Sequence, residues 1–352
     1  MKRIILYIAA LQMLCIPHYV SANVGFFIGA GQTIVPVQSE NLAMTKEEVQ
    51  FNILYDKNEK LFTSKNYVPG VRVECRFHVK NLSNKRIQGT LGFPFATSLE
   101  KTPIEKFQVI ENDRKVSKIL IDTRKAAHGR ETLFYWKSKF RPNEEKIIQV
   151  NYTQKFSYYG LYSETPKGLP EKYKRYYKAF RGAAACFYYM TSTVKTWAGN
   201  VESAKFRIAL NDFPDSRSRG NESGRGMDKP FTYCVTYANP KQFTFDSAKR
   251  TFELNAADFD GSENIFFNHL IMFLPGNKKE AARFLQEHKP GREVCTVLRN
   301  FYEAVNGRIF SGDMQEFFKN FTWYSPNKNY SVDAIPQRDY EIIQEFDSYL
   351  NK

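Results

Sequence analysis

Residues 71–80 read VRVECRFHVK, and this stretch indicates the fold of most of the chain. Apolar side chains at every second position alternate with charged or polar ones. A period of two places the apolar side chains on one face of a strand and the polar ones on the other, which is typical of a half-buried antiparallel strand. The stretch ends at residues 81–85, NLSNK, whose composition is that of a turn.

Similar short runs recur between about residue 33 and residue 275, separated by turn compositions at residues 112–114 and 141–143. Because a single sheet cannot bury its apolar face alone, we expect two packed sheets in an antiparallel β-sandwich. This domain is predicted to cover residues 23–276, with two subdomains as an option. The predicted strands after the first lie at residues 107–110, 119–121, 132–136, 147–152, 206–210, 231–237, 252–254 and 265–273.

From about residue 277 the apolar period becomes helical, so the sequence predicts a mainly β chain with α, ending in a small helical domain at residues 277–352. A helix that includes residues 294–302 is expected to end at Asn306-Gly307, a suitable C-terminal cap. Pro336 can begin the last helix. Apolar residues at 281–285 and 314–318 predict two further helices.

The N-terminus has the pattern of a secretory signal peptide. Lys2 and Arg3 precede an apolar run at residues 4–16, and small residues at 20–22 suit cleavage after Ala22. The run is shorter than the ~20 residues that a membrane-spanning helix needs, and no later stretch is long and apolar enough. We therefore expect an exported protein, periplasmic or secreted, with a leader at 1–22 and no transmembrane segment after processing.

Charge narrows the classes of partner. The chain carries a formal charge of +14 over 352 residues, and the two positive charges of the leader leave about +12 after cleavage. An excess of base attracts anionic partners, such as lipid head groups or cell-wall glycans, although it can also serve solubility alone. We expect no nucleic-acid partner.

Four cysteines remain after cleavage: Cys75, Cys186, Cys234 and Cys295. An oxidising compartment allows three pairings, and free buried thiols are the alternative. We prefer a disulfide between Cys186 and Cys234, because both lie in strand-like segments of one domain. No cysteine spacing suits a metal ion, and we expect neither a metal nor a cofactor.

One basic segment is a candidate binding site. Cations and aromatic rings alternate there, which suits a polyanion or a glycan through charge and stacking. The alternative is a solvated face whose rings point into the core. The segment consists of Lys172, Tyr173, Lys174, Arg175, Tyr176, Tyr177 and Lys178.

Catalytic motifs are not found in the sequence. It contains no zinc-protease, nucleophile-elbow or phosphate-loop motif, and Asp258 and Asp260 lack the spacing of a calcium loop and indicate an acidic turn. A pair of carboxylates brought together by folding would allow hydrolysis, but no two stand out, so the catalytic residues stay unknown.

The C-terminal segment resembles the YARHG domain, a small module of exported bacterial proteins. The naming pentapeptide departs from the family, because Glu303, Val305 and Asn306 replace its Tyr, Arg and His. The residues that carry the resemblance are Leu298, Arg299, Asn300, Gly307, Arg308, Ile309, Phe310, Phe317, Phe318, Trp323 and Tyr324.

The N-terminal part is similar to a family of exported bacterial proteins that often precedes this module. The residues that carry this resemblance are Gly25, residues 91–95, Trp136, Phe140, Pro142, residues 189–190 and Trp197. Neither resemblance implies an enzymatic activity. The leading hypothesis is a non-enzymatic binding or structural protein of the bacterial cell envelope that engages an anionic glycan or lipid surface. The alternatives are a hydrolase of envelope polymers, and an adaptor that docks another exported protein through its C-terminal domain.

Overall fold

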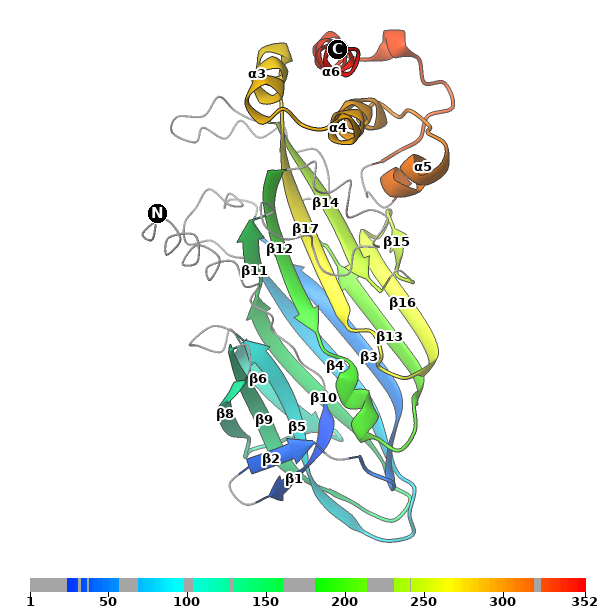
Figure 1. The fold of residues 1–352 in the computed structure, drawn as a ribbon. Coiled ribbons are helices and arrows are strands. Elements are labelled where there is room, and N and C mark those ends of the chain that lie inside the picture. Colours follow the sequence, from blue (N-terminus) through cyan, green and yellow to red (C-terminus); the bar gives the residue numbers. More distant parts are fainter. Residues whose placement is uncertain are drawn as a thin grey trace, which may run out of the picture. The chain divides into compact units, whose positions relative to one another are not determined.

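The computed structural model is mainly β, with four α-helices near the C-terminus of its described part (Figure 1). This agrees with the fold class predicted from the sequence. The predicted leader, residues 172–178 and Trp323 lie outside the described residues. The described residues are 24–30, 33–36, 38–56, 69–97, 104–126, 129–160, 181–213, 231–240, 242–319 and 324–352.

The chain divides into two compact units. The first, here called the β unit, comprises residues 1–157, 186–213 and 238–267. The second, the helical unit, comprises residues 158–185, 214–237 and 268–352, so it contains strand segments in addition to the predicted helical domain.

The strands of the described residues form three sheets, where the sequence led us to expect two. The five-stranded sheet has the order β2 (Thr33–Pro36), β1 (Gly25–Ala30), β5 (Ile87–Thr97), β9 (Gly129–Phe140) and β8 (Leu120–Ala126). The eight-stranded sheet has the order β15 (Thr244–Asp246), β16 (Thr251–Phe259), β13 (Val201–Ala209), β3 (Leu42–Leu54), β4 (Gly70–Asn81), β10 (Glu145–Lys155), β6 (Ile104–Glu111) and β7 (Arg114–Lys115). The four-stranded sheet has the order β11 (Ser157–Gly160), β12 (Arg181–Tyr189), β17 (Ile265–Leu274) and β14 (Phe231–Asn239).

Strand β4 confirms the alternation predicted for residues 71–80. Its residues at 71, 73, 75, 77 and 79 are buried, and those between them are mostly exposed. The register places Cys75 beside Val150 of β10 and Val49 of β3, so the buried face continues across the neighbouring strands. One neighbouring pair differs from the antiparallel expectation, because β3 and β13 run parallel.

Aromatic side chains cover the buried face of the eight-stranded sheet. The ring centroid of Phe93 of β5 lies 5.5 Å from that of Tyr152 of β10. Elsewhere on the same face, Phe51 of β3 meets Tyr189 of β12 at 5.4 Å. Such ring pairs add to the free energy gained by burying apolar area, and they form the core of the predicted sandwich.

Strand β5 contains a proline, which the sequence pattern did not lead us to expect in a strand. Proline lacks the N–H that a sheet ladder needs, so it is tolerated where one side of a strand has no neighbour. Strand β1 begins at Gly25, which pairs with Gly92, and Pro94 lies beyond that pair with β9 as its partner strand. The geometry therefore accommodates Pro94 inside β5.

The predicted disulfide between Cys186 and Cys234 is wrong, because Cys186 is a free, buried thiol. The two cysteines belong to β12 and β14, and β17 lies between these strands in the sheet. A disulfide joins Cα atoms less than about 7 Å apart, which strands that are not neighbours do not provide. Burial raises the pKa of Cys186 to about 12 and that of Cys295 to about 11, so both thiols stay protonated at neutral pH.

The C-terminal helices are α3 (Lys278–His288), α4 (Arg292–Val305), α5 (Gly312–Lys319) and α6 (Gln337–Leu350). The Asn277 side chain caps α3 by accepting from the backbone N–H of Glu280 at 3.0 Å. Gly307 has a φ of +92°, and an added Cβ would lie 2.9 Å from Cβ of Asn327, so both backbone conformation and space favour glycine after α4. This confirms the predicted cap.

Two short 3₁₀ helices complete the described elements, η2 (Ser192–Thr196) and η3 (Val332–Ala334). Asp260 lies in the connection between β16 and β17, as predicted for an acidic turn, whereas Asp258 belongs to β16. Among the described residues, none of the helices has both the length and the apolar character needed to cross a membrane.

Candidate functional site: a basic pocket in the β unit

A pocket of about 880 Å³ lies in the β unit, lined by residues of β6, β7 and β9 and by the segments that follow β7 and β9. This volume is within the range of small-molecule sites. Seven exposed cations line it, and they are Arg86, Arg114, Lys115, Lys118, Lys137, Lys139 and Arg141. We call this site the basic pocket.

A tight turn between β6 and β7 positions the pocket residues Arg114 and Lys115. Asn112 and Asp113 both have positive φ values, 45° and 63°, as a two-residue hairpin turn of type I′ requires. The Oδ1 atom of Asn112 also accepts from the backbone N–H of Ile147 at 2.9 Å, which fixes the turn against β10. Arg114 and Lys115 then return along β6, where they form the edge strand β7.

A buried ion pair lies beneath the exposed cations. The Nζ atom of Lys146, whose side chain is 8% exposed, donates to Oε2 of Glu111 at 2.9 Å. It also donates to Oγ of Ser138 at 3.0 Å and to the backbone carbonyl of Lys139 at 2.9 Å. The other carboxylate oxygen of Glu111 accepts from Nε1 of Trp136 at 2.8 Å. All three donors of the ammonium group are thus used, and the pair joins β6, β9 and β10 into a fixed floor.

The charges of the basic pocket do not cancel. Eight basic and two acidic residues line it, which leaves an excess of six positive charges. Of the two acids, Glu111 neutralises Lys146, and Glu144 accepts from the backbone N–H of Arg141 at 2.6 Å. A concave surface with one sign of charge concentrates ions of the opposite sign, and arginine side chains bind phosphate or carboxylate groups through two parallel hydrogen bonds. The arrangement suits an anionic ligand.

Sequence reasoning located the turns of this site but missed its cations. Residues 112–114 and 141–143 are turn signals, and they occur at the predicted places. The signal that could have found them was the high density of basic residues beside these turns, at residues 114–118 (RKVSK) and 137–141 (KSKFR). The predicted binding segment at residues 172–178 lies outside the described residues, so its role stays a prediction.

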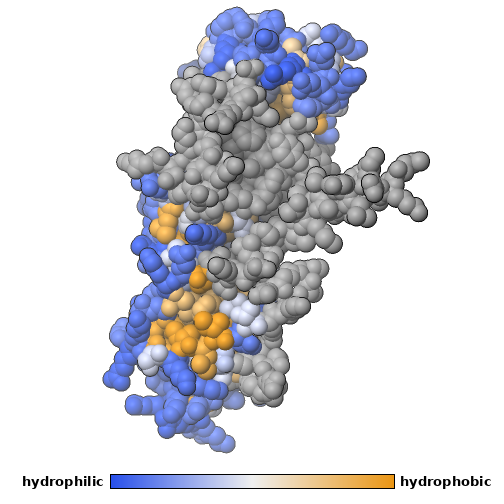
Figure 2. Space-filling view, turned by 90° about the vertical axis from the view of Figure 1, so that its left-hand side faces the viewer, coloured by the Kyte–Doolittle hydropathy of each residue, from blue (hydrophilic) through white to orange (hydrophobic). Residues whose placement is uncertain are grey.

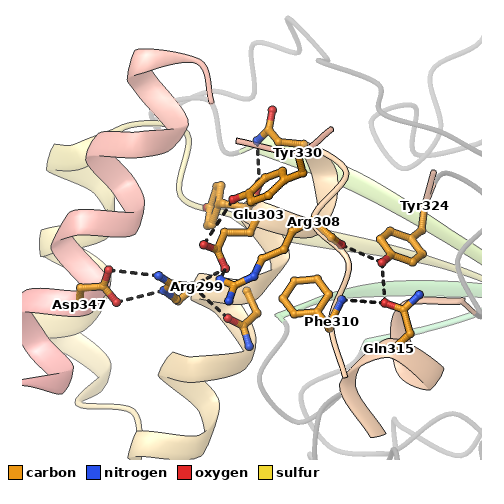
Figure 3. A network of polar contacts seen from close by, with 11 residues as sticks. Arg299, Glu303, Arg308, Phe310, Gln315, Tyr324, Tyr330 and Asp347 are labelled. Carbon is orange, nitrogen blue, oxygen red and sulfur yellow. Dashed lines mark hydrogen bonds and ion pairs between the residues drawn. The ribbon is translucent and has the colours of Figure 1, made fainter. Parts of the chain in front are cut away.

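The motif residues of the helical unit gather around a buried carboxylate (Figure 3). Glu303 of α4 is 2% exposed, and its Oε2 atom accepts from Nη1 of Arg299 and from Nη1 of Arg308. Its other oxygen accepts from the hydroxyl of Tyr330 at 3.4 Å. Arg299 in turn donates through Nε to Asp347 of α6 at 3.0 Å. We call this set the Glu303 network.

Other motif residues hold the segment that follows α4. The hydroxyl of Tyr324 donates to the backbone carbonyl of Arg308 at 2.7 Å and lies 2.8 Å from Oε1 of Gln315. The same Gln315 oxygen accepts from the backbone N–H of Phe310 at 2.8 Å (Figure 3). The Asn300 side chain accepts from Arg299 at 3.3 Å. The structure therefore brings these predicted residues together, and it gives them contacts within the unit.

Glu303 was noted in the sequence only as a departure from the naming pentapeptide. In the structure it is the centre of the network, and its spacing of four residues from Arg299 on one helix was a usable signal. Burial, followed by the nearby Glu303 carboxylate, raises the pKa of Tyr330 to about 12. The charges of this network are largely balanced by its own members.

No family model matches the chain, and no curated protein matches it. A solved structure from Legionella pneumophila subsp. pneumophila str. Philadelphia 1, provisionally described as a nutrient binding protein, is 18% identical, with a TM-score of 0.48. The alignment covers 95% of this chain and 100% of that one.

An M1 zinc metallopeptidase from Deinococcus radiodurans is 6% identical, with a TM-score of 0.27. The alignment covers 66% of this chain and only 43% of the peptidase, so the chain spans less than half the length of that enzyme. Likeness at these levels carries no argument about function, which has to come from the site itself.

Proposed function

We propose that this chain is a non-enzymatic binding protein of the bacterial cell envelope that holds an anionic ligand in the basic pocket. The observation that carries the proposal is the excess of six positive charges around one cavity of about 880 Å³. The floor of the cavity supports it, because Lys146 and Glu111 satisfy each other and leave the exposed cations for a ligand.

The proposal includes export, which the signal-peptide pattern of residues 1–22 suggests. Envelope polymers and lipid head groups are the anions that an exported protein meets in abundance. The YARHG-like character of the helical unit fits the same setting. Determining the N-terminus of protein purified from its host tests this part, and a mature chain that begins at Asn23 is the expected result.

The binding test uses three charge reversals in the basic pocket, Arg114→Glu, Lys115→Glu and Lys118→Glu, in one variant. The matched control reverses three exposed cations elsewhere, Lys205→Glu, Lys278→Glu and Lys279→Glu, so that both variants have the same net charge. Retention on lipopolysaccharide and on purified peptidoglycan is measured at several salt concentrations.

We expect the pocket variant to lose at least about 2 kcal/mol of binding free energy on one of these probes, since each cation near an anionic surface contributes roughly 1 kcal/mol at low salt. The control should lose much less, and high salt should weaken all binding. Equal losses in the two variants would show that net charge alone causes retention, and the proposal would then fail.

A further inference from the structure

Apolar side chains lie beside the basic pocket. Figure 2 shows hydrophobic residues gathered on one face of the molecule, over the region of the five-stranded sheet near β8, with hydrophilic residues around them. In β8, Leu120 is 39% exposed and Ile121 is 62% exposed. Leu120 also lines the basic pocket, so charge and apolar surface meet at this residue.

Leu120 and Ile121 both lie on an edge strand of the five-stranded sheet. Successive side chains of a strand point to opposite faces, and Leu120 pairs with Tyr135 while Ile121 pairs with Phe134 of β9. Among the described residues, β8 is the last strand of its sheet, so its outer edge has no paired strand. A surface that approaches this edge can therefore touch Leu120 and Ile121 together with the cations of the pocket.

Exposed cations beside exposed apolar side chains indicate which class of partner fits this surface. A glycan polymer satisfies the cations but gives exposed leucine and isoleucine side chains no apolar partner. An anionic membrane offers both, because its phosphates lie at the surface and its acyl chains begin directly beneath. It also presents many phosphates side by side, which matches an excess of six positive charges better than one small ligand does.

We propose that the basic pocket binds phosphate head groups of an anionic lipid surface while Leu120 and Ile121 enter the boundary with the acyl chains. This rests on the proposed function and names the surface that the same site engages. The geometry that carries it is the shared lining residue Leu120, which joins the cationic cavity to the apolar edge of β8.

The test separates the apolar contribution from the charge. The variant Leu120→Gln with Ile121→Gln keeps every cation, and Leu54→Gln is its control, because Leu54 is 40% exposed and belongs to β3 in the same unit. The full mature chain is sedimented with vesicles of phosphatidylglycerol and phosphatidylcholine, and with vesicles of phosphatidylcholine alone. Inorganic pyrophosphate and peptidoglycan serve as anionic probes without acyl chains.

We expect the wild-type chain and the Leu54 control to bind the phosphatidylglycerol vesicles equally, and the double variant to bind about tenfold more weakly. That factor corresponds to partial burial of two apolar side chains. Binding to pyrophosphate and to peptidoglycan should be unchanged by the double variant, since the cations remain.

Equal vesicle binding by the double variant and the wild-type chain would overturn the lipid proposal. Peptidoglycan binding that the three charge reversals abolish, without vesicle binding by the wild-type chain, would also overturn it and would identify a glycan site. In both cases the proposed function stands as long as the charge reversals weaken binding to an anionic probe more than their control does. If they do not, the proposed function fails as well.

Discussion

Both units bury charged side chains, and Lys146 of the β unit and Glu303 of the helical unit differ in what lies around them. In the β unit, the cation of Lys146 is enclosed and meets a single carboxylate, Glu111, beneath a surface crowded with exposed cations. In the helical unit, the carboxylate of Glu303 is enclosed and meets two arginines, one of which also contacts Asp347. Burial of a charge is thus common to both units.

The surroundings distinguish a structural network from a binding surface. A buried ion pair by itself is weak evidence for function, because it also serves to fix the packing of its elements. The Glu303 network balances its charges internally, whereas the basic pocket leaves six positive charges without acidic partners among its lining residues. We therefore place the ligand at the basic pocket, whose positive charge is not balanced. Three predictions test this distinction between a structural network and a binding surface.

The largest effect on stability is expected for Glu303→Ala in the helical unit. Removing the carboxylate leaves Arg299 of α4 and Arg308, in the segment after α4, without their shared partner. Loss of one member of a buried ion pair costs roughly 3–5 kcal/mol. Chemical denaturation of the mature chain measures the free energy of unfolding. Glu316→Ala, at a side chain that is 55% exposed, is the control and should change it by less than about 0.5 kcal/mol.

A small loss for Glu303→Ala, no greater than that of the Glu316 control, would show that the network does not fix the packing of α4 and α6. The contrast between the two units would then rest on the pocket alone.

A smaller effect is expected for Lys146→Met in the β unit. Glu111 loses its ion pair but keeps the hydrogen bond from Trp136, and its side chain is 16% exposed, so we expect a loss of about 2 kcal/mol. Adding Glu111→Gln to this variant removes the unpaired charge. The double variant should therefore lose less than the two single variants together, with a coupling energy of about 1 kcal/mol. Additive losses would contradict the pairing that the structure shows.

The smallest effect is expected for Tyr330→Phe, which removes one hydroxyl from the Glu303 network at a cost of at most about 1 kcal/mol at pH 7. Because the folded chain raises the pKa of Tyr330 to about 12, the unfolded chain loses this proton first as pH rises past 10. The stability that the group contributes is complete below pH 10 and disappears as pH approaches 12.

Wild-type stability should therefore fall more steeply than that of Tyr330→Phe between pH 10 and pH 12, as measured by denaturant midpoints at a series of pH values. Parallel curves for the two proteins would mean that the hydroxyl does not lie against Glu303.

Strand alternation and helical periodicity were enough to predict the mainly β class, many of the strands and the four helices, because both patterns follow directly from which face of an element is buried. They did not predict the strands β1, β2, β5 and β12. The pattern failed where a strand broke a local rule. Strand β3 was missed because it carries Lys46, Glu47 and Glu48 in sequence, and Glu47 is buried in the sandwich, where it accepts from the hydroxyl of Tyr189 at 3.0 Å. A local window holds no information about a partner 142 residues away.

The site was harder to predict than the fold. The net charge of the chain indicated an anionic partner. It did not indicate the pocket, because the cations that form it come from three separate segments, around Arg86, residues 114–118 and residues 137–141. Their convergence depends on how β6, β9 and β10 are ordered in two sheets. The clustered residues of the helical unit were easier to predict, because they are close in sequence.

The parallel pairing of β3 with β13 has a consequence for how the chain is made. Residues 46–52 lie beside residues 203–209, so one long edge of β3 stays open until more than 200 residues have been synthesised. Such distant pairing slows folding, and an open edge invites association with other chains. We therefore expect a nascent or truncated chain that ends before residue 203 to aggregate. A chaperone that binds the β3 edge would be displaced when β13 pairs with it.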